Sequence, residues 1–240
     1  MTDVAASVAR VRERIEAAAR RSGRRPEEIT LVAVTKGVDL PQIEQVVACG
    51  ITDLGESRVQ EALPKVAALA AGLRGAGIDR IVVRPGSPPV RWHMVGHLQR
   101  NKVRQAAVVF SVVHSVDSVR LATELSHRTE GALDVLLQVN VAGEAQKFGV
   151  PPDAVPSVLQ EMARLPRLRI IGLMTIVNDP QQARPVFRRL RLLRDEVNPQ
   201  RIGEVMLAHL SMGMTDDFEV AVEEGATMVR IGRAIFGGRT

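Results

Sequence analysis

The chain has 240 residues, of which 45% are hydrophobic, enough for the buried core of one large domain over residues 1–240. Its 32 lysines and arginines exceed its 27 aspartates and glutamates by a modest margin, which gives only weak support to nucleic-acid binding. The one cysteine excludes an internal disulfide framework and a thiolate metal cluster.

The first residues predict an amphipathic helix over 3–21. Val4, Val8, Val11 and Ile15 recur there at helical spacing among charged residues. A signal peptide would instead carry a continuous apolar core, and no run elsewhere in the sequence is long and apolar enough for a transmembrane helix. We therefore expect a cytoplasmic protein that has no membrane partner.

Eight short apolar runs, rich in valine, isoleucine and leucine, follow along the chain. Most are separated by helical patterns long enough to connect parallel strands. Eight such units predict an α/β fold, a single-domain TIM (β/α)8 barrel with an extra N-terminal helix. The predicted strands are 29–35, 51–55, 92–96, 108–113, 134–141, 168–176, 204–208 and 227–232, and the predicted helices between them are 39–48, 57–70, 99–106, 117–128, 152–164, 180–195 and 216–223.

The pattern leaves one alternative architecture and one irregular stretch. A doubly wound open sheet is the alternative, but its first turn is usually rich in glycine, whereas the first turn here reads TKGVDL. The irregular stretch is 71–90, AGLRGAGIDRIVVRPGSPPV, whose glycines and prolines predict an inserted loop before the third strand.

Lys36 directly follows the apolar run ITLVAVT, at the carboxyl end of the first predicted strand. In TIM barrels the active sites are assembled on this face. We expect the hydrophobic strand to desolvate the lysine partly, which disfavours its charged form and leaves an amine able to attack a carbonyl group. The alternative is a lysine that simply reaches solvent. When Lys36 is considered by itself, this alternative is favoured.

Two segments containing glycine follow the seventh and eighth predicted strands, HLSMGMTDDF at 209–218 and VRIGRAIFGG at 229–238. The corresponding loops of barrels commonly bind phosphate, because backbone N–H groups converge there and a helix N-terminus favours an anion. Combined with a lysine at a strand end, the segments favour an anion site over ordinary turns. The candidate contacts are two glycines that allow close approach, two hydroxyl donors and one fixed charge, namely Gly213, Gly232, Ser211, Thr215 and Arg230.

Other polar residues near strand ends carry less information. Asn140 and Lys147 flank the fifth loop, QVNVAGEAQKFGV, and are secondary candidates, Lys147 as a second amine or anion contact. His93 lies near the third turn, where it could line a site, but a place in the core is favoured. Paired carboxylates, HExxH and a Ser-His-Asp order are missing from the sequence, so hydrolase and metal chemistry have no positive support.

Taken together, several segments closely resemble the pyridoxal phosphate homeostasis protein family, whose fold is similar to the N-terminal barrel of alanine racemase. The resemblance covers residues 3–238, nearly the whole chain. The segments are AVTKGVDLPQIEQVVACGITDLGESRVQEAL, WHMVGHLQRNKV, LLQVNVAGEAQKFGV, GLMTIV and LSMGMTDDFEVAVEEGATMVRIGRAIFG. The most diagnostic pieces are TK after the first strand, GHLQRNK, and the pair LSMGMTDD and RIGRAIFG.

The resemblance implies that pyridoxal 5'-phosphate (PLP) is held as a Schiff base on Lys36. It also implies phosphate contacts from a hydroxyl group, from the backbone after the seventh strand and from the turn after the eighth, through Ser211, Met212, Gly213, Arg230, Gly232 and Arg233.

Two positions depart from the family pattern. Ser57 stands where the family commonly has asparagine, in GEN, so an amide contact near the cofactor ring is shortened or replaced by water. Arg233 stands where the family usually has threonine, which removes a hydroxyl donor and leaves the backbone N–H of this residue as the predicted contact.

The sequence favours a PLP carrier over an enzyme. Racemases of the related fold use a tyrosine from a second domain opposite the lysine, and this sequence contains no tyrosine. If Arg230 reaches the pyridine nitrogen, it would keep that nitrogen unprotonated and weaken the ring as an electron sink. We therefore expect a protein of intracellular PLP homeostasis without significant catalysis. A PLP-dependent amino-acid racemase is the alternative.

The expected partners are PLP itself and PLP-dependent apo-enzymes, and we expect a monomer. A third hypothesis, a basic module that binds nucleic acid or protein, depends on the arginine-rich stretch 184–194. There Val186, Leu190, Leu193 and Val197 recur at helical spacing, which predicts a surface helix with solvated arginines. We therefore expect no nucleic-acid partner.

Overall fold

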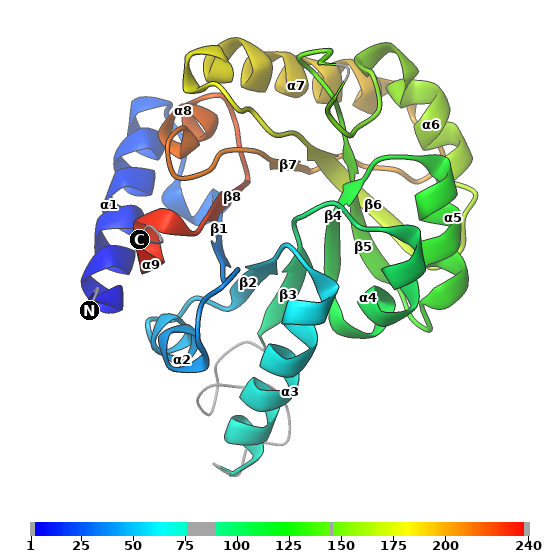
Figure 1. Ribbon diagram of the computed structural model, residues 1–240. Coiled ribbons are helices and arrows are strands. Elements are labelled where there is room, and N and C mark those ends of the chain that lie inside the picture. Colours follow the sequence, from blue (N-terminus) through cyan, green and yellow to red (C-terminus); the bar gives the residue numbers. More distant parts are fainter. Residues whose placement is uncertain (1–2, 76–89, 145, 238–240) are drawn as a thin grey trace.

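The computed structural model describes residues 3–75, 90–144 and 146–237, which form a closed barrel of parallel strands surrounded by helices (Figure 1). Each strand pairs with the next in the chain, and β1 closes the ring against β8. This confirms the predicted TIM barrel and excludes the open sheet. The strands are β1 Thr30–Val34, β2 Asp53–Glu56, β3 Arg91–Met94, β4 Val112–Val116, β5 Leu133–Gln138, β6 Leu168–Met174, β7 His209–Ser211 and β8 Met228–Ile231.

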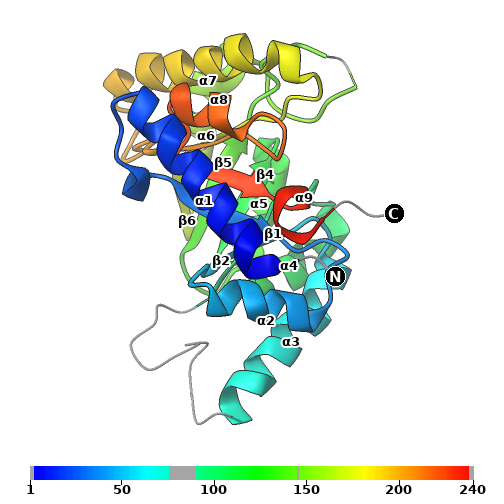
Figure 2. The same ribbon diagram turned by 90° about the vertical axis from the view of Figure 1, so that its left-hand side faces the viewer.

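Helices cover the outside of the barrel (Figures 1 and 2). None of those in the described ranges is both long and apolar enough to cross a membrane. The α-helices are α1 Val4–Arg21, α2 Leu40–Ala48, α3 Val59–Gly75, α4 Val103–Val109, α5 Val119–Arg128, α6 Val155–Met162, α7 Ala183–Val197, α8 Phe218–Glu223 and α9 Arg233–Phe236. Single 3-10 turns are η1 Pro26–Glu28, η2 Arg100–Lys102, η3 Pro152–Ala154, η4 Pro180–Gln182 and η5 Asn198–Gln200.

The predicted N-terminal helix is present as α1. It starts after Asp3, whose side chain accepts a hydrogen bond from the amide of Ala6 at 3.0 Å. Its valine and isoleucine face is buried, and the helix contacts α2, α8 and α9 (Figure 2). Arg14 extends this contact, because its guanidinium binds both carboxylate oxygens of Glu219 and lies 4.5 Å from the centre of the Phe218 ring. The extra helix therefore completes the outer ring between α8 and α2.

Alternation along the strands separates an outer core from the barrel interior. Val113 and Leu137 belong to the large apolar core that includes the surrounding helices. Their neighbours Val112 and Leu136 point the other way and form a separate apolar cluster with Met174. This cluster lies in the interior beside β4, β5 and β6, and the interior also contains the polar side chains described below.

One predicted strand, 204–208, is not a strand. The side chain of Asn198 binds both backbone groups of Leu207, with its Oδ1 accepting from the amide at 3.0 Å and its Nδ2 donating to the carbonyl at 3.3 Å. These bonds replace those that a neighbouring strand would supply. The seventh strand is β7, which places Ser211 within a strand and not in the loop after it. Arg230 likewise lies within β8.

Two further predictions shift along the chain. The fourth strand was predicted at 108–113, but α4 continues to Val109 and β4 begins at Val112. Val108 is 84% exposed at the end of this helix, so its apolar character does not reflect burial in a strand. The loop predicted over 71–90 lies mostly outside the described residues, and its part at 71–75 belongs to α3.

Strands β6 and β7 approach each other closely at Gly172, which is paired with His209. A Cβ atom on residue 172 would lie 2.0 Å from the carbonyl oxygen of His209 and 2.6 Å from its carbonyl carbon. Backbone atoms cannot move aside as a flexible side chain can, so only glycine fits at this position.

We predict that Gly172→Ala lowers the free energy of unfolding by at least about 2 kcal/mol, because the strands must separate to admit a methyl group. Denaturant unfolding measures the effect. The matched control is Gly131→Ala, at an exposed site with no atom within 4 Å of the added carbon. The control should change stability by less than about 0.5 kcal/mol, and equal losses in the two variants would contradict the prediction.

Candidate functional site

A cavity of about 540 Å³ opens at the carboxyl ends of the strands. Its volume suits a small molecule, for which sites of roughly 300–1,000 Å³ are usual. Volume alone does not single it out, because a cavity of about 520 Å³ lies at the opposite end of β1 and β2. Its place does, because TIM barrels assemble their sites at the carboxyl ends of the strands, and Lys36 and Gly232 line it there. Its polar residues are Lys36, Ser57, Asn178, Thr215, Asp216, Asp217, Arg230 and Arg233.

Lys36 lines this cavity from the turn after β1. The expectation that the apolar strand partly desolvates it is wrong, because the residue is exposed. The strand ends at Val34, and Thr35 takes the last buried position. Lys36 is therefore the first residue of this segment that faces solvent.

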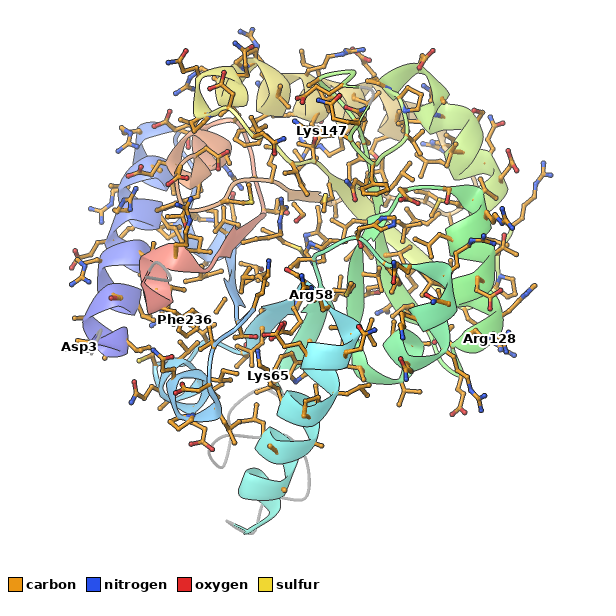
Figure 3. The ribbon with its side chains drawn as sticks, viewed as in Figure 1. Asp3, Arg58, Lys65, Arg128, Lys147 and Phe236 are labelled. Atoms are coloured by element: carbon orange, nitrogen blue, oxygen red, sulfur yellow. The ribbon has the colours of Figure 1, made fainter. Side chains whose placement is uncertain are left out.

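A buried ion pair holds the backbone next to Lys36. The ammonium group of Lys65, from α3, donates to the carbonyl oxygen of Thr35 and to Glu56 Oε1, each at 2.6 Å. The Thr35 hydroxyl donates to the same carboxylate oxygen at 2.6 Å. Burial raises the pKa of Glu56, and these two donors oppose the rise. Lys65 belongs to α3 (Figure 3) and Glu56 is the last residue of β2, so these two elements together fix the turn that carries Lys36.

The turn after β7 requires glycine. Gly213 has a φ of +94°, and a Cβ atom there would lie 2.5 Å from the Cβ of Ala221 and 2.9 Å from the Cα of Phe218. The preceding Met212 is fully buried, and its amide donates to the carbonyl of Met228 at 3.2 Å. The backbone therefore packs tightly against α8 as it enters the cavity wall.

Arg230 reaches the cavity from inside β8, although only 4% of its surface is exposed. Its Nη1 donates to Ser211 Oγ at 2.6 Å, and its Nη2 donates to the carbonyl of Thr175 at 3.0 Å. Burial lowers the pKa of Arg230 to about 10, with the negative charge of Asp217 opposing the change. The guanidinium therefore stays charged near neutral pH and is held at two nitrogens.

Ser211 connects Arg230 to a chain of hydrogen bonds across the barrel interior. Ser211 Oγ lies 2.7 Å from His114 Nδ1, His114 Nε2 lies 2.8 Å from His93 Nδ1, and His93 Nε2 lies 2.9 Å from Asp53 Oδ1. We call these five residues, Arg230 included, the interior network. They come from β2, β3, β4, β7 and β8.

Burial determines the charge states in the interior network. It lowers the pKa of His93 and lowers that of His114 well below its ordinary value, so both rings are neutral near neutral pH. Burial alone would raise the pKa of Asp53, but the hydrogen bond from His93 and the nearby charge of Arg91 hold it below its ordinary value. Two neutral histidines therefore lie between a carboxylate and a guanidinium.

The turn after β8 provides the other predicted contacts. Gly232 lines the cavity at the start of α9, where the first amides of a helix have no partner within the helix. The side chain of Arg233 points to Asp216 and forms an exposed ion pair with it. Thr215 Oγ1 accepts from the amide of Ala234 at 3.4 Å, which joins this turn to the one after β7.

Asn140 and Lys147 lie in a different place. Lys147 forms an ion pair with Glu144, whose carbonyl accepts from Asn140 Nδ2 at 2.8 Å, so this loop folds on itself. Lys147 lines a separate cavity of about 420 Å³, which shares Ile176 and Val177 with the first one. Figure 3 shows Lys147 and Lys65 on opposite sides of the barrel.

The structure divides the predicted residues into three groups. One group lines the main cavity, a second lies behind it in the strand and turn, and a third belongs to the loop beside the neighbouring cavity, which Lys147 lines. The first group is Lys36, Ser57, Thr215, Arg230, Gly232 and Arg233; the second is Ser211, Met212 and Gly213; the third is Asn140 and Lys147.

The sequence did not predict roles for Asp53 and His114, and it favoured a core position for His93, which is 0% exposed. A signal was present, because a histidine at the centre of VVHSV interrupts a strand of otherwise small or apolar residues. Partners for such a residue lie far away in sequence, so the strand alone could not identify them.

The chain resembles known proteins over nearly its whole length. A family model described as the N-terminal domain of alanine racemase matches residues 7–240. A protein of Aquifex aeolicus named pyridoxal phosphate homeostasis protein is 41% identical over 238 residues, which cover 97% of this chain and 96% of that protein. A protein of that name from Pseudomonas aeruginosa is 40% identical and matches all of this chain and 97% of its own.

Solved structures give the same picture. PipY of Synechococcus elongatus PCC7942, solved with PLP bound, has a TM-score of 0.75 at 32% identity, over 95% of this chain and 100% of that chain. Alanine racemase from Corynebacterium glutamicum has a TM-score of 0.60 at 19% identity, over 95% of this chain and 61% of that chain. At that identity the second likeness concerns the fold alone.

The buried histidines predict an acid-sensitive fold. His93 and His114 have lower pKa values in the folded protein than their ordinary 6.5, so the unfolded chain binds more protons below about pH 6.5. Stability should fall as the pH drops from about 7 to about 5, by up to about 1.4 kcal/mol per pH unit for each histidine. The partly buried His209, whose pKa burial also lowers, contributes in the same direction.

Denaturant unfolding at several pH values measures this slope. The free energy of unfolding should depend less steeply on pH in His114→Gln than in the wild type, whatever the absolute stability of the variant, because one titrating ring is gone. His127→Gln, at an exposed position on α5, is the control and should keep the wild-type slope. An unchanged slope in His114→Gln would show that this ring binds protons equally in the folded and unfolded states, so that burial does not lower its pKa.

Proposed function

This chain belongs to the pyridoxal phosphate homeostasis protein family, and we propose that it binds PLP and takes part in intracellular PLP homeostasis. In this proposal Lys36 holds the cofactor as a reversible Schiff base. The observation that carries it is the meeting of Lys36, Arg230 and the Gly232 turn around one cavity at the strand ends. The relative solved with PLP bound supports the same ligand.

The residues around the cavity fit PLP. When bound, PLP supplies an aldehyde that a lysine amine can capture reversibly, together with a phosphate that needs hydrogen-bond donors. Lys36 presents its amine at the open side of the cavity. The amides of Gly232 and Arg233 begin α9, and the hydroxyl of Thr215 lies beside them. These groups would hold the phosphate, with the charge of Arg230 near by.

The predicted phosphate contacts at Ser211 and Met212 take a different form in this proposal. The Ser211 hydroxyl already binds Arg230 and His114, and the Met212 amide binds Met228. Both would therefore support the cavity wall through Arg230 and the Gly213 turn. The turn after β8 would then make the direct contacts to the phosphate.

Arg230 favours carriage over catalysis. A guanidinium can only donate hydrogen bonds, so a pyridine nitrogen facing it would have to stay unprotonated. An unprotonated ring withdraws electrons weakly and makes carbanion chemistry at the substrate harder. If Arg230 faces the phosphate instead, it adds to the anion site, and PLP binding is favoured in either case.

The alternative function, a PLP-dependent amino-acid racemase, needs a second acid–base group opposite Lys36. The 240 residues include no tyrosine. The cavity does contain two aspartates, but Asp217 Oδ1 accepts from the amide of Met214 at 2.6 Å and Asp216 is paired with Arg233. Both carboxylates are thus engaged, and the names of the full-length relatives point to homeostasis as well.

The remaining parts of the proposal concern partners and location. We place the protein in the cytoplasm as a monomer that passes PLP to PLP-dependent apo-enzymes. Nucleic acid is not among the proposed partners, because most arginines of α7 are paired with nearby carboxylates. The pairs join Arg184 with Glu223 and Glu224, Arg189 with Glu196, Arg191 with Glu224 and Arg194 with Asp195.

Borohydride reduction tests the link to Lys36. We expect the wild type to become yellow with PLP, to bleach on reduction, and to carry a pyridoxyl group on the peptide that contains residue 36. Lys36→Ala should lose this adduct. Lys102→Ala, a lysine that does not line the cavity, is the control and should keep it. Equal labelling of Lys36→Ala and wild type would exclude Lys36 as the attachment point.

Chiral chromatography separates the carrier from the racemase. Holo-protein incubated with single L-amino acids should leave their configuration unchanged, because both aspartates among the described residues of the cavity are engaged. Inversion that persists after purification and disappears in Lys36→Ala would establish the alternative function. The same samples should keep their bound PLP, which a spectrum before and after incubation records.

A further inference from the structure

The interior network crosses the whole barrel, from the cavity that holds Lys36 to the opposite end. Arg230 lines that cavity, whereas Asp53 lines the cavity beneath β1 and β2. Each of the four hydrogen bonds between them is 2.6 to 2.9 Å long, and all but the last join side chains that are buried at both ends. The two cavities are thus joined by one continuous set of contacts.

Asp53 gives these hydrogen bonds a direction. An ionised carboxylate can only accept, so the proton of His93 lies on Nε2 and its Nδ1 is an acceptor. His114 must then donate from Nε2, which leaves its own Nδ1 to accept from the hydroxyl of Ser211. The Ser211 oxygen is left to accept from Arg230, whose nitrogens can only donate. With both rings neutral, this arrangement of protons gives each of the four hydrogen bonds of the network one donor and one acceptor.

Charged groups outside the network agree with this direction. Arg91 has its Nη1 3.8 Å from Asp53 Oδ1 and its Nη2 3.7 Å from Asp134, so a positive charge lies beside the accepting end. His209 is the other titratable side chain facing inward from β7, and its Nδ1 lies 3.2 Å from the hydroxyl of Thr227. At the other end Asp217 lies near Arg230. Negative charge thus flanks the donor and positive charge flanks the acceptor.

We infer that Asp53, His93 and His114 are positioning residues for the cofactor, which act through Ser211 to hold the guanidinium of Arg230 toward the cavity. The inference rests on the proposed function, because PLP is the ligand that the held guanidinium meets. A planar guanidinium anchored at Nη1 by Ser211 and at Nη2 by Thr175 cannot rotate. Its remaining N–H groups therefore keep one orientation for an incoming acceptor.

The interior network is not needed merely to fill the interior of the barrel. TIM barrel interiors are usually filled by branched apolar side chains. Val112, Leu136 and Met174 do this on one side of the same interior. Burying two imidazoles on the other side, with a partly buried carboxylate, costs free energy unless all are paired, so a purely structural solution would favour apolar residues. The polar side is the one that ends at Arg230.

The first test needs no cofactor. Nitrogen-15 NMR of the histidine rings in the wild type should show His93 and His114 neutral, each with its proton on Nε2, near neutral pH. In Asp53→Ala, His93 loses its acceptor and should populate the Nδ1 tautomer. Asp53→Asn keeps an oxygen that can accept, and should retain the wild-type pattern. Protonated Nδ1 atoms in the wild type would overturn the direction of the network.

The second test measures PLP affinity by absorbance titration. Asp53→Ala should bind PLP about tenfold more weakly, the effect of one lost buried hydrogen bond, and Asp53→Asn should recover most of this loss. Ser115→Ala is the matched control, since Ser115 is as buried as His114, lies beside it on β4 and has no side-chain partner among the described residues. Its affinity should equal that of the wild type.

The outcomes separate this inference from the proposed function. PLP affinity in Asp53→Ala within twofold of wild type, alongside changed tautomers, would overturn the role in positioning. The role in positioning would also be overturned if Asp53→Ala and Ser115→Ala both lost PLP affinity in proportion to their loss of thermal stability. If the wild type takes up no PLP, the proposed function fails and the link to the cofactor falls with it, while the tautomers still decide whether the directed network exists.

Discussion

A guanidinium inside a β-barrel needs acceptors at a fixed distance, because a buried charge without partners costs several kcal/mol. Arg230 finds them in Ser211 on β7 and in the carbonyl of Thr175 just after β6. The hydroxyl of Ser211 then needs an acceptor of its own, which β4 supplies as His114. His114 in turn donates to His93 on β3, and His93 donates to Asp53 on β2. Five strands must therefore keep their register for the one buried charge of Arg230 to be tolerated.

This register also shapes the mouth of the barrel. Gly172 lets β6 and β7 come close enough for Thr175 and Ser211 to share Arg230. On the other side, Lys65 binds the carbonyl of Thr35 and fixes the turn that presents Lys36. The two cationic residues of the site are therefore supported from different places. Arg230 is held from within the barrel, and Lys36 is held from the outer helix α3.

The alternation of apolar runs and helical patterns was sufficient to predict the barrel, and the cavity that Lys36 lines opens on the face where the candidate site was expected. It failed for β7, because Leu207 looks like a strand residue and only the distant Asn198 shows where its backbone bonds go. That error placed Ser211 in a loop. Lys147 was a secondary candidate for an amine or anion contact, but it is paired with Glu144 and lines a neighbouring cavity. The interior network joins residues up to 97 positions apart, beyond the reach of any local pattern.

The contrast between the exposed Lys36 and the buried Arg230 helps to distinguish a PLP carrier from a PLP-dependent enzyme. PLP enzymes gain from excluding water, which would otherwise compete with the substrate and screen the charges of the site. Lys36 instead lies where water reaches it, which in the proposed function would favour release of the aldehyde. Arg230 is held by two hydrogen bonds and is shielded from water, which suits recognition of a constant part of the ligand. If the ligand is recognised through the fixed charge of Arg230 and bonded through the open amine of Lys36, as we propose, the site favours reversible storage, because release would need only water and no movement of the barrel.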